Sequence, residues 1–193
     1  ENQKVSIKCG SNKFSLTTLP ASEFPAVEET VGTHELKLQQ NLLKTMMDQT
    51  AFAMAQQDVR YYLNGMLFEI TNKNLKAVAT DGHRLAMTDL DTEFLTESKT
   101  EAIIPRKGIH ELMRLLDNSE TITSVTLGSN HLRVVTPVFT FTSKLIDGRF
   151  PEYDRVLPKN GDRTLISDRE ALKDAFSRAS ILCNEKYRGV KMK

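Results

Sequence analysis

The stretch LKAVATDGHRLAMTDL, residues 75–90, places strand-forming residues on both sides of Asp81 and Gly82. Asp-Gly is a favoured dipeptide at the centre of a type I′ turn, because both central residues of that turn need positive φ. The stretch therefore predicts two antiparallel strands joined by a tight hairpin. It also brings an acid, a histidine and an arginine, Asp81, His83 and Arg84, within four positions of one another.

Similar patterns lie on either side of this hairpin. VRYYL (residues 59–63) and MLFEI (residues 66–70) flank Asn64 and Gly65, another dipeptide favoured in type I′ turns. Later in the chain, SVTLGSN, LRVVT and FTFTSKL give three short strand-like runs separated by turn residues, over residues 124–145. We expect both regions to form antiparallel meanders.

Three segments carry apolar residues at the i, i+3, i+4, i+7 spacing of an amphipathic helix. They cover residues 42–54, about 105–116, and a segment beginning at Asp168. The expected core faces are Leu43, Met46, Met47, Thr50 and Met54; Ile109, Leu112, Met113 and Leu116; and Leu172, Ala175, Phe176 and Ala179. Pro105 suits the first turn of the second helix, and Ser167 with Glu170 matches a capping box before the third. The order of elements predicts an α+β fold in which a helix-plus-strands unit occurs twice.

The chain also contains a repeat of domain length. Phe14 and Phe141 lie 127 residues apart, and Phe24 and Phe150, each followed by proline, lie 126 residues apart. Such a period is far longer than a solenoid unit, so it predicts repeated domains within a longer protein. The expected segments are the end of one domain at residues 1–31, a complete domain at 32–158 and the start of a third at 159–193.

Composition narrows the class of protein. Basic and acidic residues number 26 and 25, and 39% of residues are hydrophobic, the balance of a soluble globular protein. No apolar run approaches the ~20 residues of a membrane-spanning helix, so no membrane partner is expected. Cys9 and Cys183 lie far apart without a CxxC motif, which suits a reducing cytoplasm and predicts neither disulfides nor a zinc site.

Only one pair of residues is a candidate for catalysis. The chain has no GxSxG, GxGxxG or GxxxxGK[ST] motif. The four histidines, His34, His83, His110 and His131, lack metal-ligand spacing, so we expect no metal site and no cofactor. Asp81 with His83 is a possible acid/base pair, which leaves a hydrolase or nucleotide-modifying enzyme as an alternative function.

The hairpin turn favours binding over catalysis. His83, Arg84 and Leu85 are expected to protrude beside Leu63, forming an apolar floor with polar edges that suits a short peptide. Basic side chains are also expected on two helix faces: Lys37 and Lys44 with Gln40, and Lys107, His110 and Arg114 beside Arg106. Such faces are usually solvated, and they gain a role only when several surround one nucleic-acid duplex.

Three motifs in fixed order and spacing give the chain a specific resemblance. They are RYYLNG (residues 60–65), VATDGHRLA (78–86) and DGRFPEYDRVLP (147–158). The chain resembles the family of bacterial DNA polymerase III beta subunits, the sliding clamps, over essentially its whole length. NEKYRGVKM (184–192) is similar to a segment of the third clamp domain. The resemblance implies a DNA clamp fold, with helices on one face and sheets on the other, and a non-catalytic protein.

In this family, two three-domain subunits close head to tail into a ring around duplex DNA. The resemblance implies a processivity factor that is a homodimer at full length. Its implied partners are double-stranded DNA, the DNA polymerase III alpha subunit, the clamp loader and other proteins with a clamp-binding motif. The matching DNA-contacting positions are Gln57, Tyr61, Tyr62, Arg106 and Lys107. The matching positions of the peptide cleft are Leu63, Thr80, Gly82, His83, Arg84, Leu85, Pro151, Arg155 and Val156.

Two other functions stay open on the sequence. One is the enzyme that would use Asp81 and His83. The other is an adhesion or scaffold protein built from repeated domains, without a role on DNA.

Overall fold

The computed structural model describes residues 3–24, 34–91, 99–159, 161–183 and 189–192. The chain divides into two compact units, Glu1–Phe150 and Pro151–Lys193. The domain boundary expected at residues 31–32 lies outside the described residues, as do residues 184–188 of the NEKYRGVKM motif. Among the described helices, none has the length and apolar character needed to cross a membrane.

The first unit opens with a hairpin and continues as two copies of one strand-helix-strands unit. The hairpin pairs β1 (Lys4–Cys9) with β2 (Asn12–Thr17). The first copy contains β3 (His34–Gln39), α1 (Gln40–Asp48), β4 (Gly65–Ile70), β5 (Asn74–Thr80) and β6 (Leu85–Asp91). The second contains β7 (Thr100–Pro105), α2 (Arg106–Leu115), β8 (Ile122–Leu127), β9 (His131–Val135) and β10 (Thr140–Lys144). The prediction of an α+β fold with a duplicated unit is confirmed.

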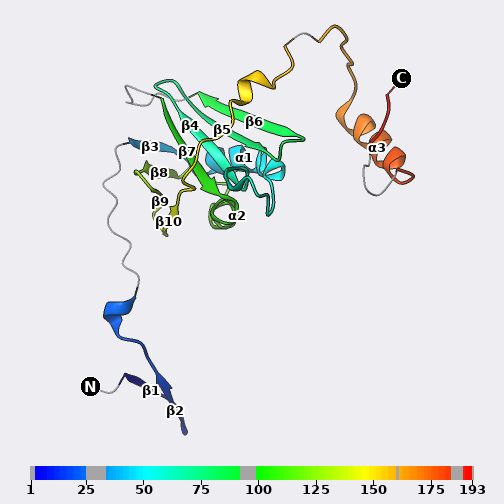
Figure 1. Cartoon of the computed structure of the whole chain (residues 1–193). Helices are drawn as coiled ribbons and strands as arrows, with labels where there is room; N and C mark the ends of the chain where they lie inside the picture. Colours follow the sequence, from blue (N-terminus) through cyan, green and yellow to red (C-terminus); the bar gives the residue numbers. More distant parts are fainter. Residues whose placement is uncertain (1–2, 25–33, 92–98, 160, 184–188, 193) are drawn as a thin grey trace. The chain divides into compact units, whose positions relative to one another are not determined.

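The two copies exchange their first strands. The sheets have the orders β10-β9-β8-β3 and β6-β5-β4-β7, with antiparallel neighbours throughout (Figure 1). β3 of the first copy therefore completes the sheet of the second, and β7 completes the sheet of the first. Neither strand was predicted, because each lies directly before a helix and its partner is distant in the sequence.

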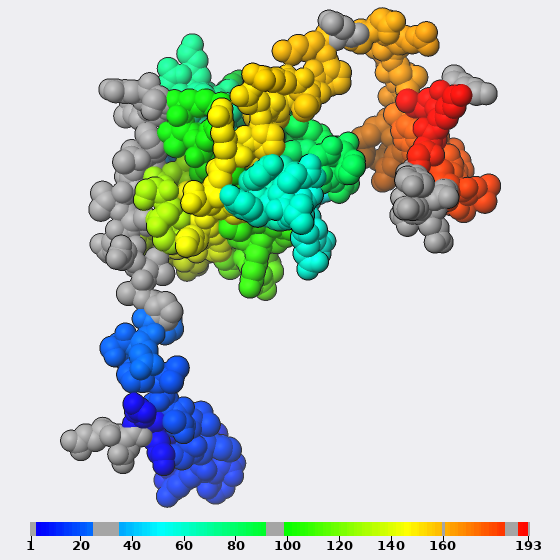
Figure 2. Space-filling view, in the orientation of Figure 1, coloured from blue at the N-terminus to red at the C-terminus, as the bar shows by residue number. Residues whose placement is uncertain are grey.

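The helices α1 and α2 and the two four-stranded sheets share one apolar core. The five residues predicted for the first helical face are all buried. The α-helix α1 nevertheless ends at Asp48, and a 3₁₀ turn, Ala51–Ala53, carries the chain onward. In α2, Ile109 and Leu112 are fully buried as predicted, and α1 and α2 contact each other. Figure 2 shows this part of the first unit as one continuous body, with the cyan segment around residues 50–60 at its surface.

The basic face predicted for the first helix is wrong. Lys37 lies on β3, and Gln40 is only 2% exposed. Lys44 donates from Nζ to the carbonyl oxygen of Leu116 at 2.9 Å, so it stabilises the C-terminal end of α2. Burial and strand pairing override the helical spacing on which the prediction depended.

The predicted hairpin at Asn64 and Gly65 is also wrong. Tyr61–Leu63 forms a 3₁₀ turn, η3, and Gly65 is already the first residue of β4. A β carbon at Gly65 would lie 2.6 Å from the carbonyl oxygen of Ile104, so the glycine allows β4 and β7 to approach closely. The turn between β4 and β5 lies at residues 71–74 instead.

The second unit contains a 3₁₀ turn, η4 (Tyr153–Arg155), and the helix α3 (Arg169–Ser180). The N-cap of α3 is Asp168, whose side chain accepts from the backbone N–H of Ala171 at 2.9 Å. The predicted N-cap, Ser167, is therefore wrong by one residue. None of the residues in α3 is buried, so the predicted inward face of this helix is wrong for this chain. The described part of the unit contains no sheet that could cover that face.

Candidate functional site

The turn between β5 and β6 is held by its own side chains. The strand pairing leaves residues 81–84 as a four-residue loop. The Asp81 carboxylate accepts hydrogen bonds from the backbone N–H groups of His83 and Arg84, at 2.9 and 3.0 Å. Thr80 donates from Oγ1 to the carbonyl oxygen of Arg84 at 2.7 Å. The predicted hairpin is therefore confirmed, with a longer loop than expected.

The turn is not of type I′. Gly82 has a φ of +87°, but among the described non-glycine residues positive φ occurs at Gln3 and Gln57, and not at Asp81. A type I′ turn needs positive φ at both central residues. Asp81 contributes through its side chain instead, because its carboxylate binds the N–H groups of the next turn residues.

These contacts bear on the acid/base role considered for Asp81. Partial burial would raise the pKa of Asp81, but hydrogen bonds from the backbone of His83 and from Arg84 outweigh this and lower it. The bond to His83 goes to its backbone, not to its ring, and the second carboxylate oxygen pairs with Arg84 Nε at 3.1 Å. A carboxylate with a lowered pKa and occupied oxygens is a weak base. The geometry therefore gives no support to catalysis by Asp81 and His83.

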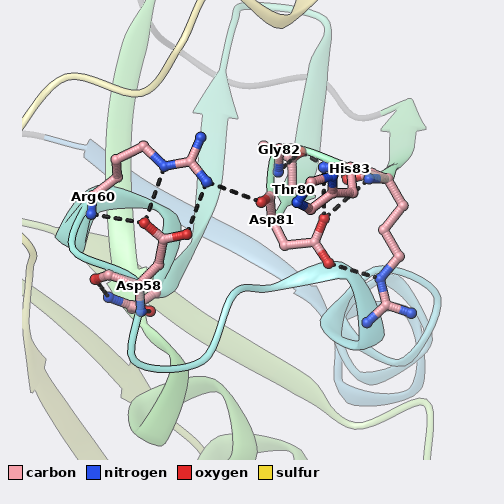
Figure 3. Close-up of polar contacts among 8 residues, drawn as sticks. Asp58, Arg60, Thr80, Asp81, Gly82 and His83 are labelled. Carbon is pink, nitrogen blue, oxygen red and sulfur yellow. Dashed lines mark hydrogen bonds and ion pairs between the residues drawn. The ribbon is translucent and has the colours of Figure 1, made fainter. Parts of the chain in front are cut away.

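A neighbouring loop contacts this turn through Arg60. The guanidinium of Arg60 forms two hydrogen bonds with the carboxylate of Asp58, at 3.0 and 2.8 Å. Its Nη2 also donates to the carbonyl oxygen of Asp81 at 3.2 Å (Figure 3). The hydrogen bonds from the Arg60 side chain and backbone lower the pKa of Asp58 to about 2. Asp58 is thus ionised at neutral pH and holds Arg60 against the turn.

The structure brings one group of the predicted cleft residues together in the first unit. Gly82, His83 and Arg84 are exposed in the turn, and Leu85 is half-buried beside them. Thr80 and Leu63 are buried, with Leu63 only 2% exposed. The turn is exposed as predicted, whereas Leu63, at the end of η3, is buried; its role as an apolar floor stays a prediction.

The other three predicted cleft residues belong to the second unit. Pro151 and Arg155 are exposed, and Val156 is 70% exposed. Arg155 forms an ion pair with Glu152 across one turn of η4, at 2.6 Å. Their assignment to a peptide cleft stays a prediction.

A hollow of about 350 Å³ lies beside the turn, and about half of its lining residues were not predicted as site residues. It is lined by Phe52, Met54, Ala55, Gln56, Asp58, Asp81, His83, Arg84 and Arg106. The guanidinium carbon of Arg84 stands 5.6 Å from the centre of the Phe52 ring, a cation–π contact. One feature of the sequence could have pointed to this hollow. Phe52 falls outside the apolar positions of the predicted first helix, and in the structure it is exposed.

Three of the predicted DNA-contacting residues lie in the loop that carries Arg60. Gln57 is exposed and has a φ of +56°. Tyr61 is exposed, and its ring meets that of Tyr62 edge-on with centres 5.7 Å apart. A β carbon on Gly148 would lie 3.2 Å from the Tyr61 ring and 3.6 Å from the β carbon of Tyr62. The exposed residues Tyr61 and Gln57 are therefore available to a ligand.

The other two lie at the start of α2. Lys107 is exposed, and Arg106 is half-buried. Arg106 donates from Nη1 to the carbonyl oxygen of Met54 at 3.0 Å, while its backbone N–H donates to Asn64. Arg106 therefore presents only part of its guanidinium, whereas Lys107 is exposed. Within the part of the chain that the structure describes, no three His, Cys, Asp or Glu side chains are grouped to hold a metal ion.

Comparison with known proteins decides the family of this fold. The description "DNA polymerase III beta subunit, central domain" matches residues 37–152, which is more than half of the chain. The chain belongs to the DNA polymerase III beta subunit family. The description "DNA polymerase III beta subunit, C-terminal domain" of the same family matches residues 154–193.

Relatives of this beta subunit chain are similar along its whole length. The Beta sliding clamp of Pseudomonas putida is 53% identical over 192 residues, which are 100% of this chain and 52% of that protein. The Beta sliding clamp of Escherichia coli K12 is 48% identical over the same share. The chain thus spans about half the length of these relatives.

Solved beta subunit structures share the fold. The DNA polymerase III subunit beta from Pseudomonas aeruginosa, 52% identical, superposes with a TM-score of 0.90 over 97% of this chain and 51% of that one. The sliding clamp from Bacillus subtilis, 26% identical, gives 0.85 over 96% of this chain and 49% of that one. The predicted DNA clamp fold is therefore confirmed.

Proposed function

We propose that this chain is part of a DNA sliding clamp, a ring that encircles duplex DNA and tethers the replicative polymerase. The observation that carries the proposal is the identity of about half of all residues with Beta sliding clamps along the entire chain. The proposed domains are the end of domain 1 at residues 1–31, domain 2 at 32–158 and the start of domain 3 at 159–193. The proposed protein is a cytoplasmic homodimer at full length, and the catalysis belongs to its polymerase partner.

The exposed groups of the first unit support a DNA-facing role without base readout. Lys107, part of Arg106 and the loop of Gln57, Tyr61 and Tyr62 offer cationic and polar side chains. Contacts of this kind neutralise phosphates and carry no sequence information, so the protein can slide. The binding weakens with salt, and retention on DNA comes from the closed ring.

The turn of residues 81–84 supports a second role, in binding peptides. Its exposed residues, with Leu63, Thr80, Leu85, Pro151, Arg155 and Val156, make up the proposed peptide cleft. Short segments ending in bulky apolar residues are the proposed ligands, from the DNA polymerase III alpha subunit, the clamp loader and other clamp-binding proteins. Burying a leucine and an aromatic ring contributes ~1.5–3 kcal/mol each before the costs of association. Leu63 is buried in this structure, so binding requires it to become accessible.

Retention on DNA of different topology tests the clamp. The full-length protein, loaded by its clamp loader, is expected to stay on nicked circular DNA and to leave the same DNA after it has been cut to a linear form. Equal retention on both forms would contradict a topological tether. Equal loss from both forms would contradict it as well.

A second experiment tests the peptide cleft. His83→Glu in the full-length protein is expected to weaken binding of a labelled peptide ending in Leu-Phe by at least about tenfold, because it places a negative charge at an exposed position of the proposed cleft without burying it in the core. Ile122→Glu, at an exposed position of β8, is the control and should bind as the wild type does. Unchanged binding by the His83 variant would remove the turn of residues 81–84 from the site.

A further inference from the structure

A chain of hydrogen bonds runs from the start of β4 to the turn of residues 81–84. The side chain of Asn64 binds the backbone of Asp58 twice: its Oδ1 accepts from the N–H at 2.9 Å and its Nδ2 donates to the carbonyl oxygen at 2.8 Å. The carboxylate of Asp58 then accepts from the backbone N–H of Arg60 at 2.8 Å and from its guanidinium. This arrangement fixes both ends of the Arg60 side chain.

The far end of Arg60 lies against the backbone of the turn. Nη2 donates to the carbonyl oxygen of Asp81, and a β carbon on Gly82 would meet Nη1 at 2.9 Å and Nη2 at 3.0 Å. The guanidinium therefore occupies the space where any other residue at position 82 would place its side chain. Figure 3 shows Arg60 between Asp58 on one side and the turn on the other.

The turn does not need this contact in order to close. Asp81 and Thr80 already satisfy the N–H groups of residues 82–84 from within the loop. The carbonyl oxygen of Asp81 points outward to Arg60, and that bond links two segments 21 residues apart. The contact therefore joins the turn to the loop of Asp58 and Arg60, and is separate from the hydrogen bonds that close the turn.

We infer that Arg60 is a positioning residue, which holds the exposed His83 and Arg84 at the orientation that a bound peptide requires. The inference rests on the proposed peptide-binding function of this turn. Lysine would not replace Arg60, since one ammonium group cannot bind both carboxylate oxygens and also reach a carbonyl in the fixed geometry of a planar guanidinium.

The test uses the full-length protein, with three measurements on each variant: affinity for a labelled peptide ending in Leu-Phe, hydrogen exchange of residues 80–85 without peptide, and melting temperature. Arg60→Ala is expected to weaken the peptide about 5- to 10-fold, the scale of one lost hydrogen bond. It is also expected to speed exchange in the turn, and to lower the melting temperature by no more than the small amount that the loss of an exposed ion pair costs. Arg60→Lys should show the same two changes to a smaller degree. Arg114→Ala is the matched control, an exposed arginine of α2 paired with Glu111, and should match the wild type.

Each other outcome overturns the inference in a distinguishable way. Wild-type affinity in Arg60→Ala would show that the orientation of the turn does not depend on Arg60, while a loss of affinity in His83→Glu in the same assay would keep the proposed cleft. Weaker binding with unchanged exchange would make Arg60 a direct peptide contact. Wild-type affinity and exchange in Arg60→Lys would show that only the positive charge of Arg60 matters, and not its hydrogen-bond geometry. If the wild type itself failed to bind the peptide, the proposed function would fall together with the inference.

Discussion

Among single residues, Gly82 carries the tightest constraint in the turn. Its φ of +87° is costly for any residue with a β carbon. The Arg60 guanidinium independently fills the space that such a carbon would need. Backbone conformation and close contact thus both require glycine at this position.

Gly82→Ala is expected to lower the free energy of unfolding by about 1–2 kcal/mol, since positive φ strains the alanine backbone. It should also weaken peptide binding, because the Arg60 side chain must move away. Chemical denaturation of the chain measures the first effect. The matched control is Gly161→Ala, at an exposed position where the added methyl group would meet nothing within 4 Å. A stability equal to that of the control would refute the strain.

Asp58 is the second residue whose state can be measured directly. Its pKa is lowered to about 2, chiefly by the hydrogen bonds from Arg60, against an ordinary value of 3.8. A carboxylate with a lowered folded-state pKa stabilises the protein above its unfolded pKa, and this contribution is lost as the pH falls. The contribution of Asp58 should therefore be complete above about pH 4 and disappear as the pH approaches 2.

Titration of the Asp58 carboxyl carbon by NMR tests this value. The side chains that act on it are Arg60, which binds it, and His83 across the loop. In Arg60→Ala the pKa of Asp58 is expected to return toward its ordinary value. A wild-type carboxyl that titrates near 4 would contradict the ion pair between Asp58 and Arg60.

On the scale of elements, α3 illustrates how one residue begins a helix. Asp168 accepts from the N–H of Ala171, while the hydroxyl of Ser167 donates to the carbonyl oxygen of Asp168. Only the first of these contacts satisfies a free N–H of the first helical turn.

Asp168→Ala is expected to destabilise α3 by about 0.5–2 kcal/mol, and Ser167→Ala by much less. Hydrogen exchange of residues 169–173 in the full-length protein reports on the first turn directly. If Ser167→Ala destabilised the first turn as much as Asp168→Ala, Asp168 would not be the cap, and the predicted capping box with Ser167 would be favoured.

At the level of the whole molecule, the exchanged strands make the two copies interdependent. β3 pairs with β8 and β7 pairs with β4, so neither sheet is complete without the other copy. The helices α1 and α2 and both four-stranded sheets also share one core. Residues 34–150 should therefore unfold in a single cooperative transition.

Leu36→Ala tests this cooperativity. Leu36 is 2% exposed on β3, and its loss is expected to cost about 2–5 kcal/mol. Native-state hydrogen exchange should then lose protection in β4–β6 and in β8–β10 by the same free energy. Ile122→Ala, at a position 54% exposed, should change stability by less than about 1 kcal/mol. A loss confined to β3 and its own sheet would contradict one cooperative unit.

The sequence by itself determined the features that depend on near neighbours in the chain. The apolar spacing of Leu43, Met46 and Met47 marked a buried face, and the second helix lay within a residue of its predicted bounds. The hairpin at residues 81–84 was recognisable because turn residues lie between two strand-forming runs. The motifs around it also identified the family.

Only the tertiary structure decided what depends on distant partners. Three features depend on segments that only packing brings together. They are the pairing of β3 with β8, the burial of Leu63 and the hydrogen bond from Arg60 to Asp81. Asn64 and Gly65 favour a hairpin turn locally, yet close contact with Ile104 on β7 makes that glycine part of a strand. Local preferences amount to about 1 kcal/mol or less per residue, whereas burying a large apolar side chain contributes roughly 1.5–3 kcal/mol, so the core prevails where the two conflict.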